Sequence, residues 1–417
     1  MISKNDKFEA LMVHAGQEKP DIATDARAIP IYQSQLASAS DANILQVLAE
    51  RKAQLAALGT DIINLSIGTP DMPPAAHVMQ AVSEAAQNPE NYKYTLIDPP
   101  ALTNAVQNWY KARYRVDLTG EEILSIYGSQ EGFAHIFHAL CDSGDPVIIG
   151  TPGYPIFFYG PRLAGAKVYC TPLLPENGFL IDFESIPSEI ARRARVIVAC
   201  YPSNPLGAVA GMDFYERLVS FAKRYDIAVI HDNAYSEIVH DGTPGGSFLA
   251  VPGAKDVGIE FNSLSKSYNL TGLRISFAVG NKHIIGAFRK LRTNIDYGLS
   301  SLDHAAAIAA LTGHQGIVEQ NRAAYRERRN AFCTALVKNG WNVPMTPASM
   351  FTWFPLPVND MSSEQFCMCL LKNTGVICVP GSSFGEGGEG WVRFALTQSP
   401  QRLEEAAQRI GDYLRHR

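Results

Sequence analysis

Residues 257–274 of the chain read VGIEFNSLSKSYNLTGLR, a short apolar run followed by a polar loop. The run Val257–Asn262 is typical of a buried strand, and Lys266 follows it among small hydroxyl side chains. A lysine here is poorly placed for a solvated surface charge, and a lysine that loses its proton can attack an aldehyde to form an imine. The serines and Arg274 would supply donors and positive charge for a phosphate. Taken alone, the pattern also fits a helix start with a surface lysine.

The same succession of apolar run and loop recurs through the middle of the chain, with helical patterns in between. Candidate strands are Pro146–Gly150, Lys167–Thr171, Arg195–Tyr201, Ile227–Asp232, Val257–Asn262 and Ser276–Gly280. Helical patterns cover Glu131–Leu140, Gly211–Tyr225 and Asn281–Arg292. Nearly continuous apolar strands that alternate with helices predict an α/β domain, with a mostly parallel central sheet and helices on both faces.

A second, smaller unit is predicted towards the C-terminus. The segment Gln315–Asn339, rich in Arg, Ala and Glu, predicts one long helix that leaves the first domain. Beyond it, strands of an α+β unit are predicted over Ala348–Leu356, Val376–Val379 and Trp391–Ala395. We expect a large domain over 61–305, a small domain over 306–417, and an N-terminal arm over 1–60 that packs on the small domain.

Bulk composition excludes several classes of partner. The 417 residues are 46% hydrophobic and 18% charged, with a formal net charge of −5. This balance gives no electrostatic reason to expect nucleic acid or an anionic membrane as a partner. The N-terminus is polar, and apolar stretches such as Ala305–Leu311 fall far short of the roughly 20 residues that span a bilayer. A cytoplasmic location is expected.

The cysteines and histidines do not predict a metal site. Seven cysteines is an odd number in a large chain, which argues against a disulfide framework. Cys367 and Cys369 have the spacing of half a metal site, but no second pair stands nearby, and buried thiols in an amphipathic stretch are favoured. His135 and His138 could share a helix face without a third ligand at suitable spacing. No metal is expected.

A carboxylate ends one of the candidate strands. Asp232 closes the run Ile227–Asp232, and Tyr235 follows three residues later. Ligands in open α/β sheets collect outside the carboxyl ends of the strands. A buried carboxylate needs a cation or a strong donor, and a protonated pyridine nitrogen would be such a partner. The alternative is an ordinary helix N-cap.

Three more segments with candidate ligand-binding residues either follow a predicted strand or begin a predicted helix. Asn204 lies in a rigid turn after Arg195–Tyr201, so that its side chain can point back over the sheet. The sequence GSQEG at 128–132 opens a helix whose backbone N–H groups suit a phosphate. Tyr154 follows Pro146–Gly150 and could place its ring over a flat ligand. Each feature also has a plain explanation as a turn, a helix start or a turn aromatic.

Taken together, these segments stand in a fixed order at the ends of one sheet. From about Asp61 to the C-terminus the chain resembles the class I and II aminotransferases of pyridoxal-phosphate (PLP) fold type I. It is most similar to the subgroup that contains LL-diaminopimelate aminotransferases and certain bacterial alanine transaminases. The segments that carry the resemblance are NLSIGTPD at 64–71, YKYT at 92–95, GSQEG at 128–132, TPGYP at 151–155, YPSNPLGA at 201–208, HDNAYSEI at 231–238, SLSKSYNLTGLR at 263–274 and FGEGGEGWVRFAL at 384–396.

The resemblance implies PLP as the cofactor and a role for each matching residue. Lys266 would form the Schiff base and carry the proton of the substrate Cα, while Asp232 would pair with the ring nitrogen. Tyr235 and Asn204 would hydrogen-bond the phenolic oxygen of the ring, and Tyr154 would stack on the ring. The phosphate would be held by Ser129, Gln130, Ser263, Ser265 and Arg274, joined by Tyr94 of the partner subunit.

The resemblance also implies the substrates and a homodimer with shared active sites. Arg393 would bind the substrate α-carboxylate bidentately, with Gly68 leaving room beside it. Asn204 and Tyr297 would complete the substrate site. The reaction would have two halves. An L-amino acid, alanine-like or LL-diaminopimelate, would leave its α-amino group on the cofactor, and a 2-oxo acid such as 2-oxoglutarate or pyruvate would take it away.

Some positions depart from the family pattern. Leu206 and Leu273 stand where the usual motifs have threonine and tryptophan, and we expect them to change the walls near the cofactor. The LL-diaminopimelate enzymes have a partner-subunit asparagine at the position assigned here to Tyr297. The sequence Asp296-Tyr297-Gly298 is more like the alanine-type members.

The N-terminal segment supplies the alternative enzyme class. Residues 8–35 resemble the opening of the cystathionine-synthase and O-acetylhomoserine-sulfhydrylase family, which favours sulfur amino-acid elimination or replacement. That family uses a Tyr-x-Arg pair for the neighbouring phosphate, and no such segment stands near Tyr94. A non-enzymatic PLP-binding protein, such as the sensor half of a regulator, is a third alternative, but no basic DNA-binding module is attached. The aminotransferase interpretation is favoured.

Overall fold

The computed structural model describes residues 52, 59–242 and 245–417. All of them belong to one compact unit, Ile44–Arg417. The segment 8–35, which carries the second resemblance, and almost all of the expected N-terminal arm therefore lie outside the described residues.

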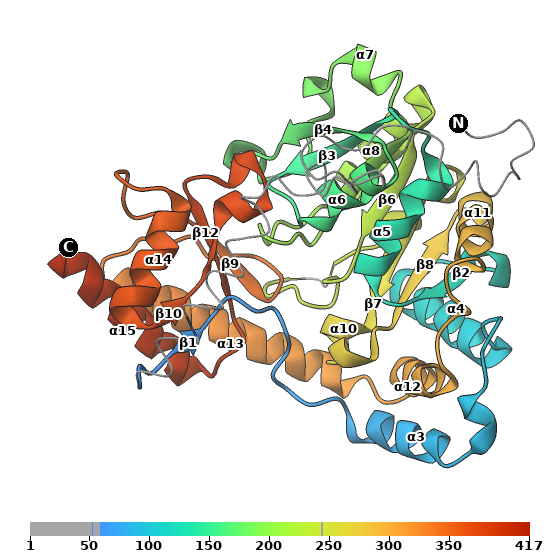
Figure 1. Ribbon diagram of the computed structural model, residues 1–417, viewed down its shortest axis with the longest axis horizontal. Coiled ribbons are helices and arrows are strands. Elements are labelled where there is room, and N and C mark those ends of the chain that lie inside the picture. Colours follow the sequence, from blue (N-terminus) through green and yellow to red (C-terminus); the bar gives the residue numbers. More distant parts are fainter. Residues whose placement is uncertain (1–51, 53–58, 243–244) are drawn as a thin grey trace, which may run out of the picture. The chain divides into compact units, whose positions relative to one another are not determined.

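A seven-stranded sheet forms the centre of the described unit, in the order β2-β8-β7-β6-β5-β3-β4 (Figure 1). Its strands are β2 (Ile123–Ile126), β3 (Pro146–Thr151), β4 (Lys167–Pro172), β5 (Val196–Cys200), β6 (Ala228–Asp232), β7 (Gly258–Ser263) and β8 (Ser276–Gly280). Strand β8 is antiparallel to both of its neighbours, and the strands from β7 to β4 are mutually parallel. The mostly parallel α/β sheet is confirmed, and β2 is the strand that the sequence did not predict.

Both faces of this sheet are covered, which is why its strands are apolar throughout. In β5, Val196 and Val198 pack into one core cluster, whereas Ile197 and Ala199 pack into the other. The first face carries α5 (Ser129–Leu140), α6 (Ile156–Leu163) and α11 (Lys282–Arg292). The second carries α3 (Ala76–Ala86), α4 (Pro100–Tyr114), α7 (Ser188–Ala191), α8 (Met212–Tyr225), α9 (Ala254–Val257) and α12 (Ser301–Thr312).

A smaller antiparallel sheet has the order β11-β12-β9, and a separate parallel pair joins β1 to β10. The strands are β1 (Ile63–Asn64), β9 (Phe351–Pro355), β10 (Val376–Ile377), β11 (Val379–Pro380) and β12 (Trp391–Ala395). The helices α13 (Gly316–Lys338), α14 (Ser363–Thr374) and α15 (Pro400–His416) belong with these strands. The predicted long helix is thus present, as are the strands predicted over Ala348–Leu356 and Trp391–Ala395. The single strand predicted over Val376–Val379 is wrong, because Cys378 separates β10, which pairs with β1, from β11, which pairs with β12. The domain limits at 60 and 305 stay a prediction.

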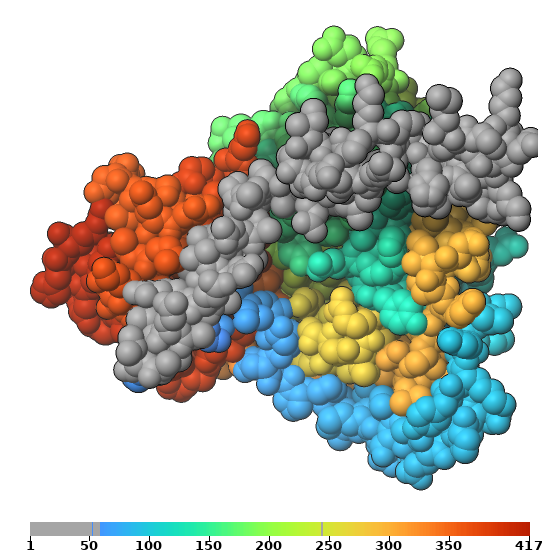
Figure 2. All heavy atoms as spheres, in the orientation of Figure 1, coloured from blue at the N-terminus to red at the C-terminus, as the bar shows by residue number. Residues whose placement is uncertain are grey.

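Short turns of helix occupy many of the connections. They are α10 (Leu264–Ser267) and the 3-10 turns η2 (Pro89–Tyr92), η3 (Gly120–Glu122), η4 (Pro175–Asn177), η5 (Phe183–Ser185), η6 (Phe248–Ala250), η7 (Thr271–Leu273), η8 (Gly381–Phe384) and η9 (Glu386–Gly388). The α10 turn lies beside the extended segment that leads to α3, because Asn269 Nδ2 donates to Pro73 O at 3.1 Å. In Figure 2 the yellow atoms of the α10 region reach the surface next to the blue atoms of that segment.

Three strand ends bring the candidate residues to one edge of the large sheet. In the parallel register, Cys200 of β5 pairs with Asp232 of β6, and Asp232 pairs with Phe261 of β7. The loops after these strands carry Asn204, Tyr235 and Lys266 respectively. They meet at the carboxyl edge, the usual ligand-binding edge of an open α/β sheet.

Two further findings concern only the described part of the chain. No helix in it is long and apolar enough to cross a bilayer. No group of three or more His, Cys, Asp or Glu side chains in it could hold a metal ion. Cys367 is buried in the core of the smaller sheet, while Cys369 is half-buried. The cytoplasmic location stays a prediction.

Candidate active site

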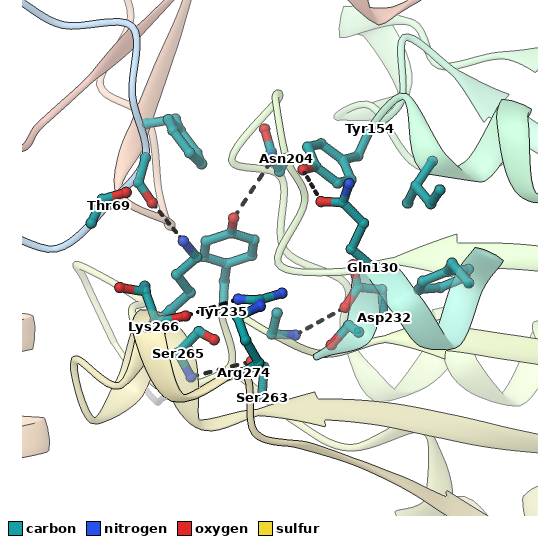
Figure 3. A pocket seen from close by; sticks show the side chains of 18 of the residues that line it. Thr69, Gln130, Tyr154, Asn204, Asp232, Tyr235, Ser263, Ser265, Lys266 and Arg274 are labelled. Atoms are coloured by element: carbon teal, nitrogen blue, oxygen red, sulfur yellow. Dashed lines mark hydrogen bonds between the residues drawn. The ribbon is translucent and has the colours of Figure 1, made fainter. Parts of the chain in front are cut away.

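A cavity of about 410 Å³ opens at this edge and gathers most of the residues singled out from the sequence. The predicted residues that line it are Gly68, Ser129, Gln130, Tyr154, Asn204, Asp232, Tyr235, Ser263, Ser265, Lys266, Arg274 and Arg393. They come from seven of the sequence segments quoted above. Figure 3 draws 18 of the lining side chains around the same space and labels ten of them.

Lys266 reaches into the cavity from the single turn α10. The hydroxyl of Ser263 caps this turn by accepting from the backbone N–H of Ser265 at 3.2 Å. The Lys266 Nζ donates to the backbone oxygen of Gly68 at 2.5 Å, across the cavity from its own strand. Burial, together with the positive charges of Arg274 and Arg393, lowers the pKa of Lys266 to about 8. A substantial share of this amine is therefore neutral near pH 7–8.

Asp232 is a buried carboxylate at the end of β6, with 6% of its surface exposed. It accepts from the backbone N–H of Ala234 at 3.3 Å and contacts the thiol of Cys200 at 3.8 Å. Within the described chain it forms no ion pair with a lysine or arginine. Burial accordingly raises the pKa of Asp232 to about 6. A cationic group placed over this carboxylate would offset the cost of burying it.

Polar side chains surround the space above Asp232. The Asn204 Nδ2 donates to the hydroxyl of Tyr235 at 3.5 Å, so both lie on one side of the cavity. The hydroxyl of Tyr154 donates to Gln130 Oε1 at 3.0 Å and ties that ring to the start of α5 (Figure 3). These contacts hold two aromatic rings and an amide around a common volume.

The opposite end of the cavity suits an anion. Helix α5 begins at Ser129, which directs free backbone N–H groups and the positive end of its dipole there. Arg274 lies against the same turn, and a Cβ added at Gly128 would stand 2.4 Å from Arg274 Nη2. The guanidinium donates to the backbone oxygen of Thr271 at 2.9 Å. Together with the hydroxyls of Ser263 and Ser265 this makes a set of donors, and Arg274 forms no ion pair with a carboxylate in the described part of the chain.

Arg393 approaches from β12 of the smaller sheet and is 7% exposed. Its Nη1 donates to Asn204 Oδ1 at 3.0 Å and its Nη2 donates to Ser66 O at 2.9 Å, while its Nε has no acceptor among the described residues. The guanidinium lies between the rings of Phe351 and Phe384, 4.1 and 4.7 Å from their centroids. Burial lowers the pKa of Arg393 to about 10. Its fixed plane and neutral partners suit a carboxylate ligand.

Glycine is required at position 68, beside Arg393. A Cβ added there would stand 2.3 Å from Phe351 Cζ, so a larger residue would displace the ring that supports Arg393. Phe351 and Phe384 were not singled out from the sequence. Phe351 begins a strand that the sequence predicts, but only the register Phe351↔Ala395 brings that strand beside β12.

Tyr94 and Tyr297 are the predicted site residues that do not line the cavity. They contact each other elsewhere, edge to face, with ring centroids 5.0 Å apart. Their residue surfaces are 82% and 55% exposed. Tyr297 lines a second cavity of about 370 Å³ together with Thr95 and Leu96.

The expected effect of two departures on the cavity walls is wrong. Leu206 is 3% exposed and belongs to the core cluster of the large sheet, and Leu273 packs against the same cluster. Neither is among the residues that line the cavity, although their neighbours Asn204, Gly272 and Arg274 are.

Comparison with known proteins agrees with this geometry. The family model "aminotransferase class I and II" matches residues 60–410. The chain is 44% identical to an LL-diaminopimelate aminotransferase of Moorella thermoacetica over 84% of this chain and 90% of that protein. It is 40% identical to another of that name from Dehalococcoides mccartyi, over 89% and 95%. A solved structure of a probable N-succinyldiaminopimelate aminotransferase from Thermus thermophilus superposes with a TM-score of 0.85, at 34% identity over 88% and 99%.

The chain therefore belongs to the class I and II aminotransferases, a PLP-dependent family of fold type I. It is an aminotransferase. The fold class and the aminotransferase activity expected from the sequence are confirmed.

The acidity of Lys266 gives a direct test of this geometry. In the cofactor-free protein, the rate of imine formation with pyridoxal should rise with pH around a midpoint near 8, because burial, Arg274 and Arg393 all favour the neutral amine. Stopped-flow absorbance would measure it, with Lys266→Arg as the blank. Arg274→Gln should move the midpoint upwards. A midpoint near the ordinary lysine value of 10.5 would contradict the arrangement.

Proposed function

We propose that this aminotransferase holds PLP in the 410 Å³ cavity and uses it to move the α-amino group of an L-amino acid to a 2-oxo acid such as 2-oxoglutarate or pyruvate. The observation that carries the proposal is the convergence on one cavity of a buried carboxylate, an acidified lysine and an arginine at a helix start. The residues fit the group at three separate points. Asp232 has no lysine or arginine partner among the residues described, the α5 start and Arg274 form an anion-binding site, and Lys266 is half-buried between them.

The chemistry divides between the cofactor and the chain. When bound, PLP supplies an aldehyde and an electron-withdrawing ring that weakens the bonds at the substrate Cα. Lys266 Nζ is the nucleophile that holds the aldehyde and the base that takes and returns the Cα proton. Asp232 keeps the proton on the ring nitrogen, since its own burial cost falls when that cation is present.

The remaining residues bind and orient the cofactor and the substrate. Tyr235 and Asn204 act as hydrogen-bond donors to the ring oxygen, and Tyr154 covers the ring face. The phosphate rests on Ser129, Gln130, Ser263, Ser265 and Arg274. Arg393 binds the substrate carboxylate, and fixing that end presents the Cα–H bond to Lys266.

Two observations bear on the identity of the amino donor, and they favour different amino acids. The curated relatives at 44% and 40% identity are named LL-diaminopimelate aminotransferases, which favours LL-diaminopimelate. The residues Asp296-Tyr297-Gly298 favour an alanine-like donor instead. Single-turnover absorbance changes against both amino acids would decide between them.

We also propose a homodimer in which each site receives residues from both chains. Leu96, Ile97 and Tyr297 line the second cavity, Tyr94 contacts Tyr297, and these four residues leave between 55% and 83% of their surfaces exposed. A cluster of large apolar side chains this exposed fits a surface that a second copy covers. Tyr94 and Tyr297 would then complete the neighbouring site.

Borohydride reduction tests the proposed function. In wild-type protein with PLP, a reduced and digested sample should carry its pyridoxyl label on the peptide that contains Lys266. Lys266→Ala should bind PLP only non-covalently and lose amino transfer by several orders of magnitude, because nucleophile and base are removed together. A label on a different lysine would disprove the assignment.

Arg393→Lys tests the carboxylate site. The variant keeps a positive charge but loses the planar fork, so kcat/KM should fall about 10- to 100-fold for all amino-acid and 2-oxo-acid substrates, as for one charge-assisted hydrogen bond. Amines without a carboxylate serve as the control and should react nearly as in wild type. A changed preference among amino acids without a general loss would instead place Arg393 in the side-chain pocket.

Mixed dimers test the shared site. Lys266→Ala and a Tyr94→Phe variant impaired in cofactor binding are unfolded together and refolded. Half of the dimers should be mixed, and each mixed dimer has one site with both lesions and one with neither. Roughly a quarter of all sites should then regain wild-type activity. Activity no higher than the mean of the separate variants would show that Tyr94 does not serve the other chain.

A further inference from the structure

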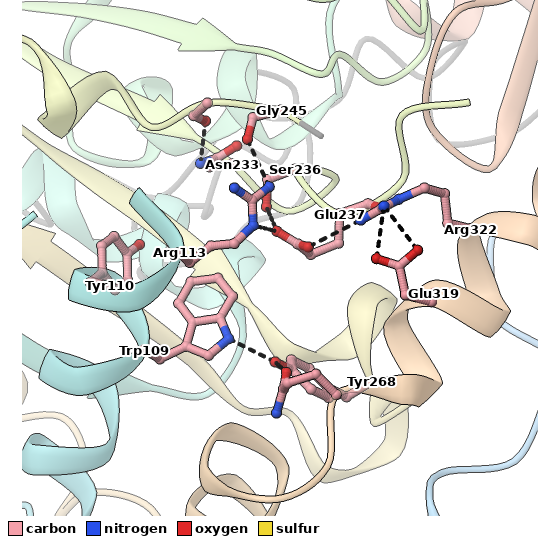
Figure 4. Close-up of polar contacts among 12 residues, drawn as sticks. Trp109, Tyr110, Arg113, Asn233, Ser236, Glu237, Gly245, Tyr268, Glu319 and Arg322 are labelled. Carbon is pink, nitrogen blue, oxygen red and sulfur yellow. Dashed lines mark hydrogen bonds and ion pairs between the residues drawn. The ribbon is translucent and has the colours of Figure 1, made fainter. Parts of the chain in front are cut away.

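Helices α4 and α13 each contact both of the loops that carry the proposed catalytic residues. One loop follows β6 and holds Asp232 and Tyr235, and the other contains α10 and Lys266. The contacts form two polar clusters outside the cavity, which Figure 4 shows together. Neither Glu237 nor Tyr268, the central residue of each cluster, is among the residues that line the cavity.

The first cluster is centred on Glu237, two residues after Tyr235. Its side chain is 6% exposed and accepts from Arg113 Nε of α4 at 2.7 Å. Arg322 of α13 lies 3.5 Å away on its other side and donates through Nε to the backbone oxygen of Glu237 at 3.0 Å. Arg113 also donates to Gly245 O at 3.0 Å. The loop is thus held from two helices at one residue.

The second cluster is centred on Tyr268, two residues after Lys266. Its hydroxyl accepts from Trp109 Nε1 of α4 at 2.8 Å and donates to Gln315 Oε1, at the N-cap of α13, at 2.6 Å. The amide of Gln315 is itself fixed, since its Nε2 donates to Ala310 O and Gly313 O. Trp109 and Arg113 are four residues apart and therefore lie on one face of α4.

Burying the Glu237 carboxylate costs free energy, so the cluster is not explained by a gain in stability. Burial raises the pKa of Glu237 above its ordinary value even though Arg113 lies against it. Buried ion pairs often add little to stability compared with apolar packing, but their directional bonds permit a single arrangement. The planar guanidinium of Arg113 donates to the Glu237 carboxylate through Nε and to Gly245 O through Nη2, and two directional bonds define position more closely than apolar contacts do.

We propose that Glu237 and Tyr268 are positioning residues through which α4 and α13 fix the separation of Asp232 and Lys266. The inference rests on the proposed function, in which those two side chains act on opposite parts of one bound group. Both loops are tied to the same two helices, one at Glu237, five residues after Asp232, and the other at Tyr268, two residues after Lys266. A change at either tie displaces one catalytic residue with respect to the other while the substrate carboxylate stays on Arg393.

Glu237→Gln is the main test, and Asp241→Asn is its matched control. Both convert a carboxylate to an amide on the same segment, and both carboxylates pair with an arginine of α13, Arg322 and Arg329. Asp241 differs because its side chain is 66% exposed, and α4 contributes no partner to it among the described residues. The measurements on PLP-loaded enzyme are kcat, KM, the melting temperature and the visible circular dichroism of the cofactor, which reports ring orientation.

Glu237→Gln should lower kcat about 10-fold or more and weaken the circular dichroism band, with KM for the amino acid little changed, because misplacement by about 1 Å costs up to 10²-fold. Asp241→Asn should leave kcat and the band as in wild type. If both variants lower the melting temperature alike and neither alters kcat or the band, Glu237 is only structural and the proposal is wrong.

Tyr268→Phe removes a single hydroxyl and keeps the buried ring, so it carries the test even if Glu237→Gln does not fold. It should lower kcat and the dichroism band in the same direction, and the double variant should show less than the product of the two losses. Wild-type values for Tyr268→Phe would overturn the proposal. Failure of the proposed function would appear elsewhere, as wild-type enzyme without a label on Lys266.

Discussion

The cost of burying the Asp232 carboxylate is the constraint around which the rest of the site is arranged. The side chain ends a central strand, and its described contacts are one backbone N–H and one thiol, neither of which carries charge. Burial raises the pKa of Asp232 to about 6, while across the cavity burial lowers the pKa of Lys266 to about 8. Both pKa shifts have the same largest cause, because a low-dielectric site favours the neutral form of an ionisable group. A ligand that is positive near Asp232 and electrophilic near Lys266 relieves both costs at once.

The cations of the cavity are linked through the same electrostatics. Arg274 and Arg393 both lower the pKa of Lys266, so each keeps that amine neutral and nucleophilic before a ligand arrives. An anion at Arg274 and a carboxylate at Arg393 would each reduce that repulsion. The amine of Lys266 would then become more basic as the site fills, which is what a group that must accept a proton from the substrate Cα requires. The aromatic faces of Phe351 and Phe384 contribute because they keep the Arg393 guanidinium away from water without neutralising it.

Local sequence patterns predicted most of the strands and most of the residues that line the cavity. The features that they missed depend on contacts between segments far apart in the chain. Ser276–Gly280 and Trp391–Ala395 were predicted with their observed limits, because each is a short, mainly apolar run between clear turn signals, although the second includes Arg393. Strand β2 has only four residues and follows directly on a 3-10 turn, so it shows no period of its own. Phe351 and Phe384 acquire their role only through the register of the small sheet. The contact of Arg113 with Glu237 joins residues 124 positions apart, and the local sequence around neither residue predicts it. Leu206 and Leu273 illustrate the reverse error, since adjacency in the sequence to cavity residues did not place them on its wall.

Several of the segments that form the site contact one helix, α13. Asn321 donates to Ser267 O at 3.0 Å, Arg322 reaches Glu237, and Arg328 forms two bonds of 2.7 and 2.8 Å with Asp71 and one of 3.1 Å with Leu396 O. Positions 321 and 328 are seven apart, so they repeat on one face of the helix. The segments after Gly68, after β6, around Lys266 and after Arg393 therefore all rest on one rigid element. Because a helix moves as a unit, a displacement of α13 would shift the carboxylate site and the Lys266 amine together. The positions at which the substrate is held and at which its proton is removed are thus set by the same helix rather than by independent loops.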